Sequence, residues 1–128
     1  GRTRIVIFLT VFNVHVNRMP VSGTICGIEY REGRFLPAFA DNLEERNERN
    51  RVLCRDTFDR PFEVWQIAGM LARRIHFWQG VDDNFQQGER FGMISLGSRT
   101  DLLLPEDVRP SVSVDETVRG GQTVIARG

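Results

Sequence analysis

The dipeptide Gly97-Ser98 lies between two apolar segments, residues 91–96 and 100–104. Such a pair ordinarily forms a turn between two strands. A chemical alternative exists, because a serine hydroxyl can attack the carbonyl before it when the backbone is strained, and glycine has no Cβ to hinder the approach. The resulting ester can eliminate and hydrolyse to an N-terminal pyruvoyl group, which is an electron-accepting ketone. These residues leave both interpretations open.

His15 is the second candidate, because it alternates with Val14 and Val16. On a strand its side chain would face away from those two valines. An imidazole has an ordinary pKa of about 6.5, which suits proton transfer at neutral pH. Arg18 follows three residues later and could hold an anionic group. The alternative is a histidine with a purely structural role.

Polar residues form two further groups. Asn47 begins the sequence Asn-Glu-Arg-Asn at 47–50, and Arg73 and Arg74 are adjacent in a segment of helical pattern. In isolation, both groups are typical of solvated surfaces, where ion pairs contribute little to stability. They are nevertheless candidates for binding an anionic substrate.

The basic residues exclude several classes of chemistry. All 17 are arginines and they balance 17 acidic residues, so the formal net charge is zero. Without lysine the chain can form no lysine Schiff base, no P-loop and no lysine-bound carrier group. The charge balance argues against nucleic acid as a partner. Cys26 and Cys54 match no zinc motif, so we expect two free thiols and no metal site.

The 128 residues fit one domain, 1–128, and the candidate residues need strands to position them. Strands are expected at 4–12, 21–30, 51–56, 62–68, 91–96, 100–104, 111–115 and 122–126. A short helix or an ordered loop is expected at 38–50, and a helix at 69–78. Two glycines within 21–30 predict a bulge, and Asp59-Arg60-Pro61 predicts a hairpin turn. The pattern predicts a β-dominated α+β fold, with a barrel-like or sandwich sheet of short strands and one or two short helices. No apolar run is long enough for a transmembrane helix, and no signal peptide is recognised.

Five segments in order resemble the phosphatidylserine decarboxylase family, in its short bacterial and archaeal form. They are IFLTVFNVHVNRMPVSG at 7–23, NERN at 47–50, QIAGMLARRI at 66–75, GERFGMISLGSRTDLLLP at 88–105 and GGQTVIA at 120–126. Together they extend over nearly the whole chain, and five motifs in family order are much more specific than any one alone.

The resemblance implies self-cleavage between Gly97 and Ser98, which would give a β chain, 1–97, and an α chain, 98–128. Ser98 would become a covalent pyruvoyl cofactor that accepts electrons as phosphatidylserine loses CO₂ and yields phosphatidylethanolamine. His15 would protonate the substrate carbon. Arg18, Arg73, Arg74 and Asn47 are the candidate substrate-binding residues.

The resemblance also implies partners. They are the phosphatidylserine substrate, a membrane lipid surface on the cytoplasmic side of the cell membrane, the two chains of one precursor, and a homodimer. The family's hydrophobic N-terminal segment and its Asp-bearing region are not in this sequence, so we expect an N-terminally truncated chain. That absence, and Asn13 where short forms commonly carry Asp, favour one alternative, an inactive β-rich binding module or fragment of the fold. Another alternative is a decarboxylase of the related archaetidylserine.

Overall fold

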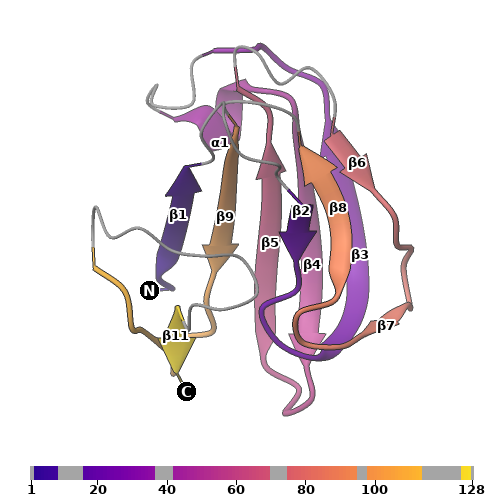
Figure 1. Ribbon diagram of the computed structural model, residues 1–128, viewed down its shortest axis with the longest axis vertical. Coiled ribbons are helices and arrows are strands. Elements are labelled where there is room, and N and C mark those ends of the chain that lie inside the picture. Colours follow the sequence, from indigo (N-terminus) through magenta and orange to yellow (C-terminus); the bar gives the residue numbers. More distant parts are fainter. Residues whose placement is uncertain are drawn as a thin grey trace.

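A computed structural model describes residues 2–8, 16–36, 42–69, 75–94, 98–113 and 125–127. Its elements are β1 (Arg4–Phe8), β2 (Val16–Arg18), β3 (Gly23–Arg31), α1 (Leu43–Arg46), β4 (Arg49–Asp56), β5 (Pro61–Ile67), β6 (Ile75–Phe77), β7 (Asn84–Phe85), β8 (Arg90–Ile94), β9 (Arg99–Leu103), β10 (Arg109–Pro110) and β11 (Ala126–Arg127). The strands form a six-stranded sheet in the order β1-β9-β5-β4-β3-β7, a three-stranded sheet β2-β8-β6 and the pair β10-β11 (Figure 1). All strand pairs named here are antiparallel.

The centre of the large sheet is a meander of β3, β4 and β5, which confirms the predicted hairpin. Its turn contains Asp59 with a φ of 61°, and the Asp56 carboxylate accepts hydrogen bonds from the backbone N–H groups of Phe58 and Arg60 at 2.9 Å. The pairing of β3 with β4 shifts between Ile25 and Gly27. The predicted bulge is therefore present at Cys26.

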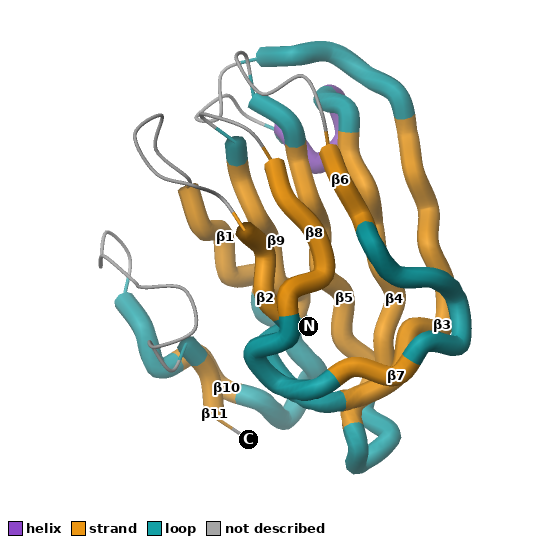
Figure 2. Tube along the Cα trace, turned by 45° about the vertical axis from the view of Figure 1, so that its right-hand side comes forward, coloured by secondary structure: helices purple, strands orange, loops and turns teal. Residues whose placement is uncertain are grey.

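The hydrophobic core lies on the face of the six-stranded sheet that carries the three-stranded sheet (Figure 2). We call this the inner face and the opposite side the outer face. Alternation along β4, β5 and β9 turns apolar side chains inward. The largest side chains of this core that are at most 2% exposed are Met19, Ile25, Val52, Val64, Phe85 and Phe91.

Strands β8 and β9 are consecutive in sequence but belong to different sheets. β8 is the middle strand of the small sheet, and β9 lies between β1 and β5 in the large one. The chain therefore crosses from one sheet to the other between Ile94 and Ser98. Residues 95–97, which include Gly97, lie outside the described part.

The β-dominated fold class is confirmed. Within the described part of 38–50, where a short helix or ordered loop is expected, the chain forms the four-residue helix α1, and the last two residues of the segment begin β4. Residues 70–74 of the helix expected at 69–78 lie outside the described residues. Residues 75–77 form strand β6 instead of a helix end, because Ile75 and Phe77 favour strand geometry and pair with Ile94 and Gly92. The sheets are open, so the finer barrel-like or sandwich description stays a prediction. The described tail strands are short, β10 and β11, and the expected turn at Gly120-Gly121 lies outside the described residues.

No helix within the described ranges is both long and apolar enough to cross a membrane.

Candidate active site

Ser98 lies directly before β9, at the crossover between the sheets, and its side chain is completely buried. Its Oγ has no hydrogen-bond partner among the described residues; the other such buried side-chain atom is Gln79 Oε1. Alternation along β9 places Ser98 on the inner side, with Thr100 and Leu102. A buried hydroxyl without a partner is energetically unfavourable, so it requires an explanation. Its oxygen lone pairs are available for reaction, which fits a nucleophile.

A chain of buried polar side chains joins the two sheets beside this serine. Asn17 on β2 donates to Thr100 Oγ1 at 2.9 Å and accepts from Gln66 Nε2 at 2.9 Å. Gln66 also donates to the backbone oxygen of His76 and accepts from Asn50 Nδ2 at 3.1 Å. Fully satisfied networks of this kind fix the relative position of the elements that they join.

Charged residues hold β9 from the outer face. Arg99 donates from Nε and Nη2 to the two carboxylate oxygens of Asp101, both at 2.8 Å, and from Nη2 to Glu44 at 2.7 Å. Arg4 on β1 donates to Asp101 Oδ2 at 2.6 Å. Asp101 is completely buried, and the side chain of Arg99 is 8% exposed.

These contacts keep the charges in place. Burial alone would lower the pKa of Arg99, but hydrogen bonds and charge from Asp101, and then from Glu44, raise that pKa above its ordinary value. Burial alone would raise the pKa of Glu44, but its own backbone N–H and the guanidinium of Arg99 lower it. Both groups are therefore ionised at neutral pH.

Two predicted substrate-binding residues lie within the described part. Asn47 is fully buried, and its amide accepts from Leu36 N–H and donates to the carbonyls of Leu36 and Ala68. Arg18 is exposed at the end of β2 and donates to the carbonyl of Gly88 at 3.0 Å. Neither has a described contact with Ser98, so their substrate-binding roles stay predictions. His15, Gly97, Arg73 and Arg74 lie outside the described residues.

Sequence reasoning missed four residues of these polar contacts, namely Asn17, Gln66, Arg99 and Asp101. The sequence could have indicated the pairing of Arg99 with Asp101, because oppositely charged residues two positions apart in a strand lie on the same face. The buried amides had no such signal, since their partners come from strands far apart in the sequence.

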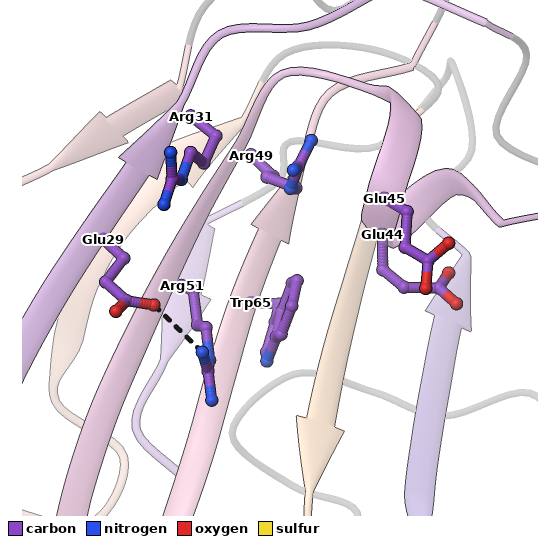
Figure 3. A pocket seen from close by; sticks show the side chains of 7 residues that line it. All are labelled: Glu29, Arg31, Glu44, Glu45, Arg49, Arg51 and Trp65. Atoms are coloured by element: carbon purple, nitrogen blue, oxygen red, sulfur yellow. Dashed lines mark hydrogen bonds and ion pairs between the residues drawn. The ribbon is translucent and has the colours of Figure 1, made fainter.

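The outer face also carries an open cavity of about 210 Å³, lined by Glu29, Arg31, Glu44, Glu45, Arg49, Arg51 and Trp65. Figure 3 shows Arg51 beside the Trp65 ring and paired with Glu29 at 2.9 Å. The cavity is on the side of the sheet opposite to Ser98. The described residues contain no group of three or more His, Cys, Asp or Glu that could hold a metal ion.

Comparison with known proteins identifies relatives over almost the whole chain. A family model described as phosphatidylserine decarboxylase matches residues 1–126. Curated proteins named phosphatidylserine decarboxylase proenzyme are similar: the one from Granulibacter bethesdensis is 50% identical over 125 residues and the one from Nitratidesulfovibrio vulgaris 49% over 126. The one from Ruegeria pomeroyi is 46% identical over 124 residues. These alignments cover 97–98% of the chain and 51–58% of the relatives' lengths, so the chain spans about half of each. No solved structure matches significantly.

Proposed function

Because this chain belongs to the phosphatidylserine decarboxylase family, we propose that the protein containing it converts phosphatidylserine to phosphatidylethanolamine and CO₂. The proposal includes a maturation step, in which the chain cleaves itself between Gly97 and Ser98. The observation that carries this step is the buried hydroxyl of Ser98, at the crossover from β8 to β9, which has no hydrogen-bond partner within the described part of the chain.

The reacting groups of maturation are this serine and the preceding carbonyl, and the overall reaction consumes one water. Ser98 Oγ attacks the carbonyl carbon of Gly97, the C–N bond breaks, and the acyl group moves from nitrogen to oxygen as an ester. Elimination removes the Cα proton of residue 98 to a base and breaks the Cβ–Oγ bond, which leaves a carboxylate on Gly97 and converts residue 98 to dehydroalanine. After tautomerisation, water replaces the nitrogen, which leaves as ammonia, and residue 98 becomes a pyruvoyl group. That group supplies an electron-accepting ketone for decarboxylation.

His15 is the proposed proton donor to the substrate carbon. His15 precedes Asn17 by two residues, and Ser98 precedes Thr100 by two residues. Asn17 and Thr100 are hydrogen-bonded to each other. Figure 1 shows β2 and β9, the strands of that hydrogen-bonded pair, running in the same direction. Arg18, Arg73, Arg74 and Asn47 remain the candidates for substrate binding.

The proposal extends to the partners. We propose that the mature protein lies at the cytoplasmic face of the cell membrane, as the family resemblance implies. Trp78 and Val81 follow β6 and are 54% and 52% exposed, and exposed large apolar side chains support contact with a lipid surface. The two chains of the mature protein come from one precursor, and a homodimer is part of the same proposal.

The test uses the complete proenzyme. Mass measurement under denaturing conditions should give two species separated at Gly97–Ser98, and the Ser98→Ala variant should stay as one. Release of labelled CO₂ from phosphatidylserine should accompany the cut and be absent from Ser98→Ala. A single uncut wild-type species without CO₂ release would instead support the inactive binding module, and archaetidylserine as a second substrate tests lipid-tail selectivity.

A further inference from the structure

We propose that the ion pair between Arg99 and Asp101 is a positioning device for self-cleavage. It fixes the Ser98 backbone from the outer face, while the Ser98 hydroxyl on the inner face is bound by none of the residues that the structure describes. We call these two side chains, with Arg4 and Glu44, the outer-face clamp. This inference rests on the proposed function and adds residues to which that proposal gives no role.

The clamp acts on the residue that directly follows Ser98. Arg99 and Asp101 are two positions apart on β9, so their side chains share the outer face. The guanidinium meets the carboxylate through two hydrogen bonds of 2.8 Å, a two-point contact that fixes orientation as well as distance. Rotation of the Arg99 backbone would break both bonds.

Two neighbouring elements anchor the pair. Glu44 on α1 accepts from Arg99, and Arg4 on β1 donates to Asp101. The backbone of Arg99 is paired with Phe8 on one side and Ile67 on the other. Arg99 is thus held by both adjacent strands and by α1, so the start of β9 is fixed without any contact to Ser98 Oγ.

This arrangement suits an intramolecular attack. The hydroxyl must stay close to the preceding carbonyl carbon, and loss of that geometry by about 1 Å slows reactions of this kind strongly. A hydrogen bond to Ser98 Oγ would fix the residue but would compete with the reaction. Fixing Ser98 through its neighbour avoids that competition.

Stability alone is a weak explanation for the clamp. Desolvation opposes buried ion pairs, and an apolar pair of similar volume often gives equal or greater stability. Asp101 is completely buried, so this reasoning applies to it directly. The inference predicts that folding and cleavage respond differently when the pair is replaced.

The test measures the first-order rate of cleavage in the complete proenzyme, with thermal unfolding of each variant in the uncleavable Ser98→Ala background. The variants are Arg99→Lys, Arg99→Ala and the apolar pair Arg99→Met with Asp101→Leu. The apolar pair should unfold near the wild-type temperature and cleave at least about tenfold more slowly, which is about 1.4 kcal/mol of barrier. Arg99→Lys keeps the charge without the two-point contact, so it should restore part of the rate lost in Arg99→Ala.

The matched control is Arg60→Lys, which alters an Arg–Asp pair at the opposite end of the sheet. Arg60 contacts Asp56 at 2.8 Å, and the Asp56 side chain is 6% exposed. This variant should cleave within about twofold of wild type, because it leaves β9 unchanged. If the apolar-pair variant folds and cleaves at the wild-type rate, the positioning role of the clamp is wrong and the proposed function stands. The same conclusion follows if the apolar-pair variant misfolds and Arg99→Lys cleaves at the wild-type rate. If the wild-type proenzyme never cleaves, the proposed function itself fails.

Discussion

Asn17 donates a hydrogen bond to the Thr100 hydroxyl across 2.9 Å, which joins the strand after His15 to the strand after Ser98. Gln66 donates to the same asparagine at 2.9 Å. Asn17→Ala removes one of the hydrogen bonds of Gln66 and the described partner of the Thr100 hydroxyl, so it should lower the free energy of unfolding by about 1–3 kcal/mol. Thr100→Val keeps the shape of the side chain and removes only the hydrogen bond with Asn17, so it should lower the free energy of unfolding by less than Asn17→Ala does. Urea unfolding in the Ser98→Ala proenzyme measures both, and strictly additive effects in the double variant would contradict the coupling.

Gly92 on β8 should not tolerate a side chain. A Cβ there would overlap the backbone oxygen of His76 and the amide of Gln66. We expect Gly92→Ala to destabilise the protein by about 1–3 kcal/mol or more, because the strands would have to separate. Gly80→Ala is the matched control, since a Cβ at Gly80 would meet only Asp83, at an ordinary 3.8 Å. Equal midpoints of thermal unfolding for the two variants would show that the space around Gly92 is not restrictive.

The two cysteines should differ in reactivity. Burial, with a smaller effect of the nearby Cys26 and Glu63, raises the pKa of Cys54 to about 12, whereas Cys26 is exposed. Thiolate is the reactive form, so Cys54 should resist alkylation at neutral pH. Iodoacetamide followed by peptide mass measurement should label Cys26 in the folded protein and both residues in urea. Equal labelling of both without urea would contradict this prediction.

Acid should destabilise the fold partly through Glu63. Burial alone would raise its pKa, but hydrogen bonds from Arg51 and Trp65 and the charges of Arg51 and Arg2 lower it below the ordinary 4.5. A lowered folded-state pKa contributes stability above the ordinary pKa, and that contribution is lost as pH falls through the folded value. Glu63→Gln should therefore make the free energy of unfolding less dependent on pH below about 4.5. Urea unfolding of wild type and Glu63→Gln at several pH values measures this dependence, and identical profiles for the two would contradict the prediction.

Strands were predictable where the sequence itself carries the signal. Alternation and β-branched residues identified β3, β4, β5 and β9, and paired glycines identified the bulge. The helix expected at 69–78 was wrong at its end, because the apolar spacing of Ile75 and Trp78 suits either a helix turn or strand β6 with its exit. β8 and β9 belong to different sheets because of long-range strand pairing. No local sequence pattern predicts this pairing.

The candidate site was predictable only in part. The chemistry of Gly97-Ser98 and the family motifs pointed to Ser98, and its burial is a new structural observation. The positions of Asn17 and Gln66 follow from contact between sheets, since 49 residues separate them in the chain. Asn47 was chosen as a polar residue within a motif, and the structure shows that its amide joins two loop segments.

The place of β9 between β1 and β5 determines how a cut chain would behave. After a break at Gly97–Ser98, β9 would belong to one piece, while both of its hydrogen-bonded neighbours would belong to the other. Dissociation would have to open both ladders and expose Leu102 and Leu104, which are core residues. The two pieces would therefore unfold together as one cooperative unit, and dilution alone would not separate them.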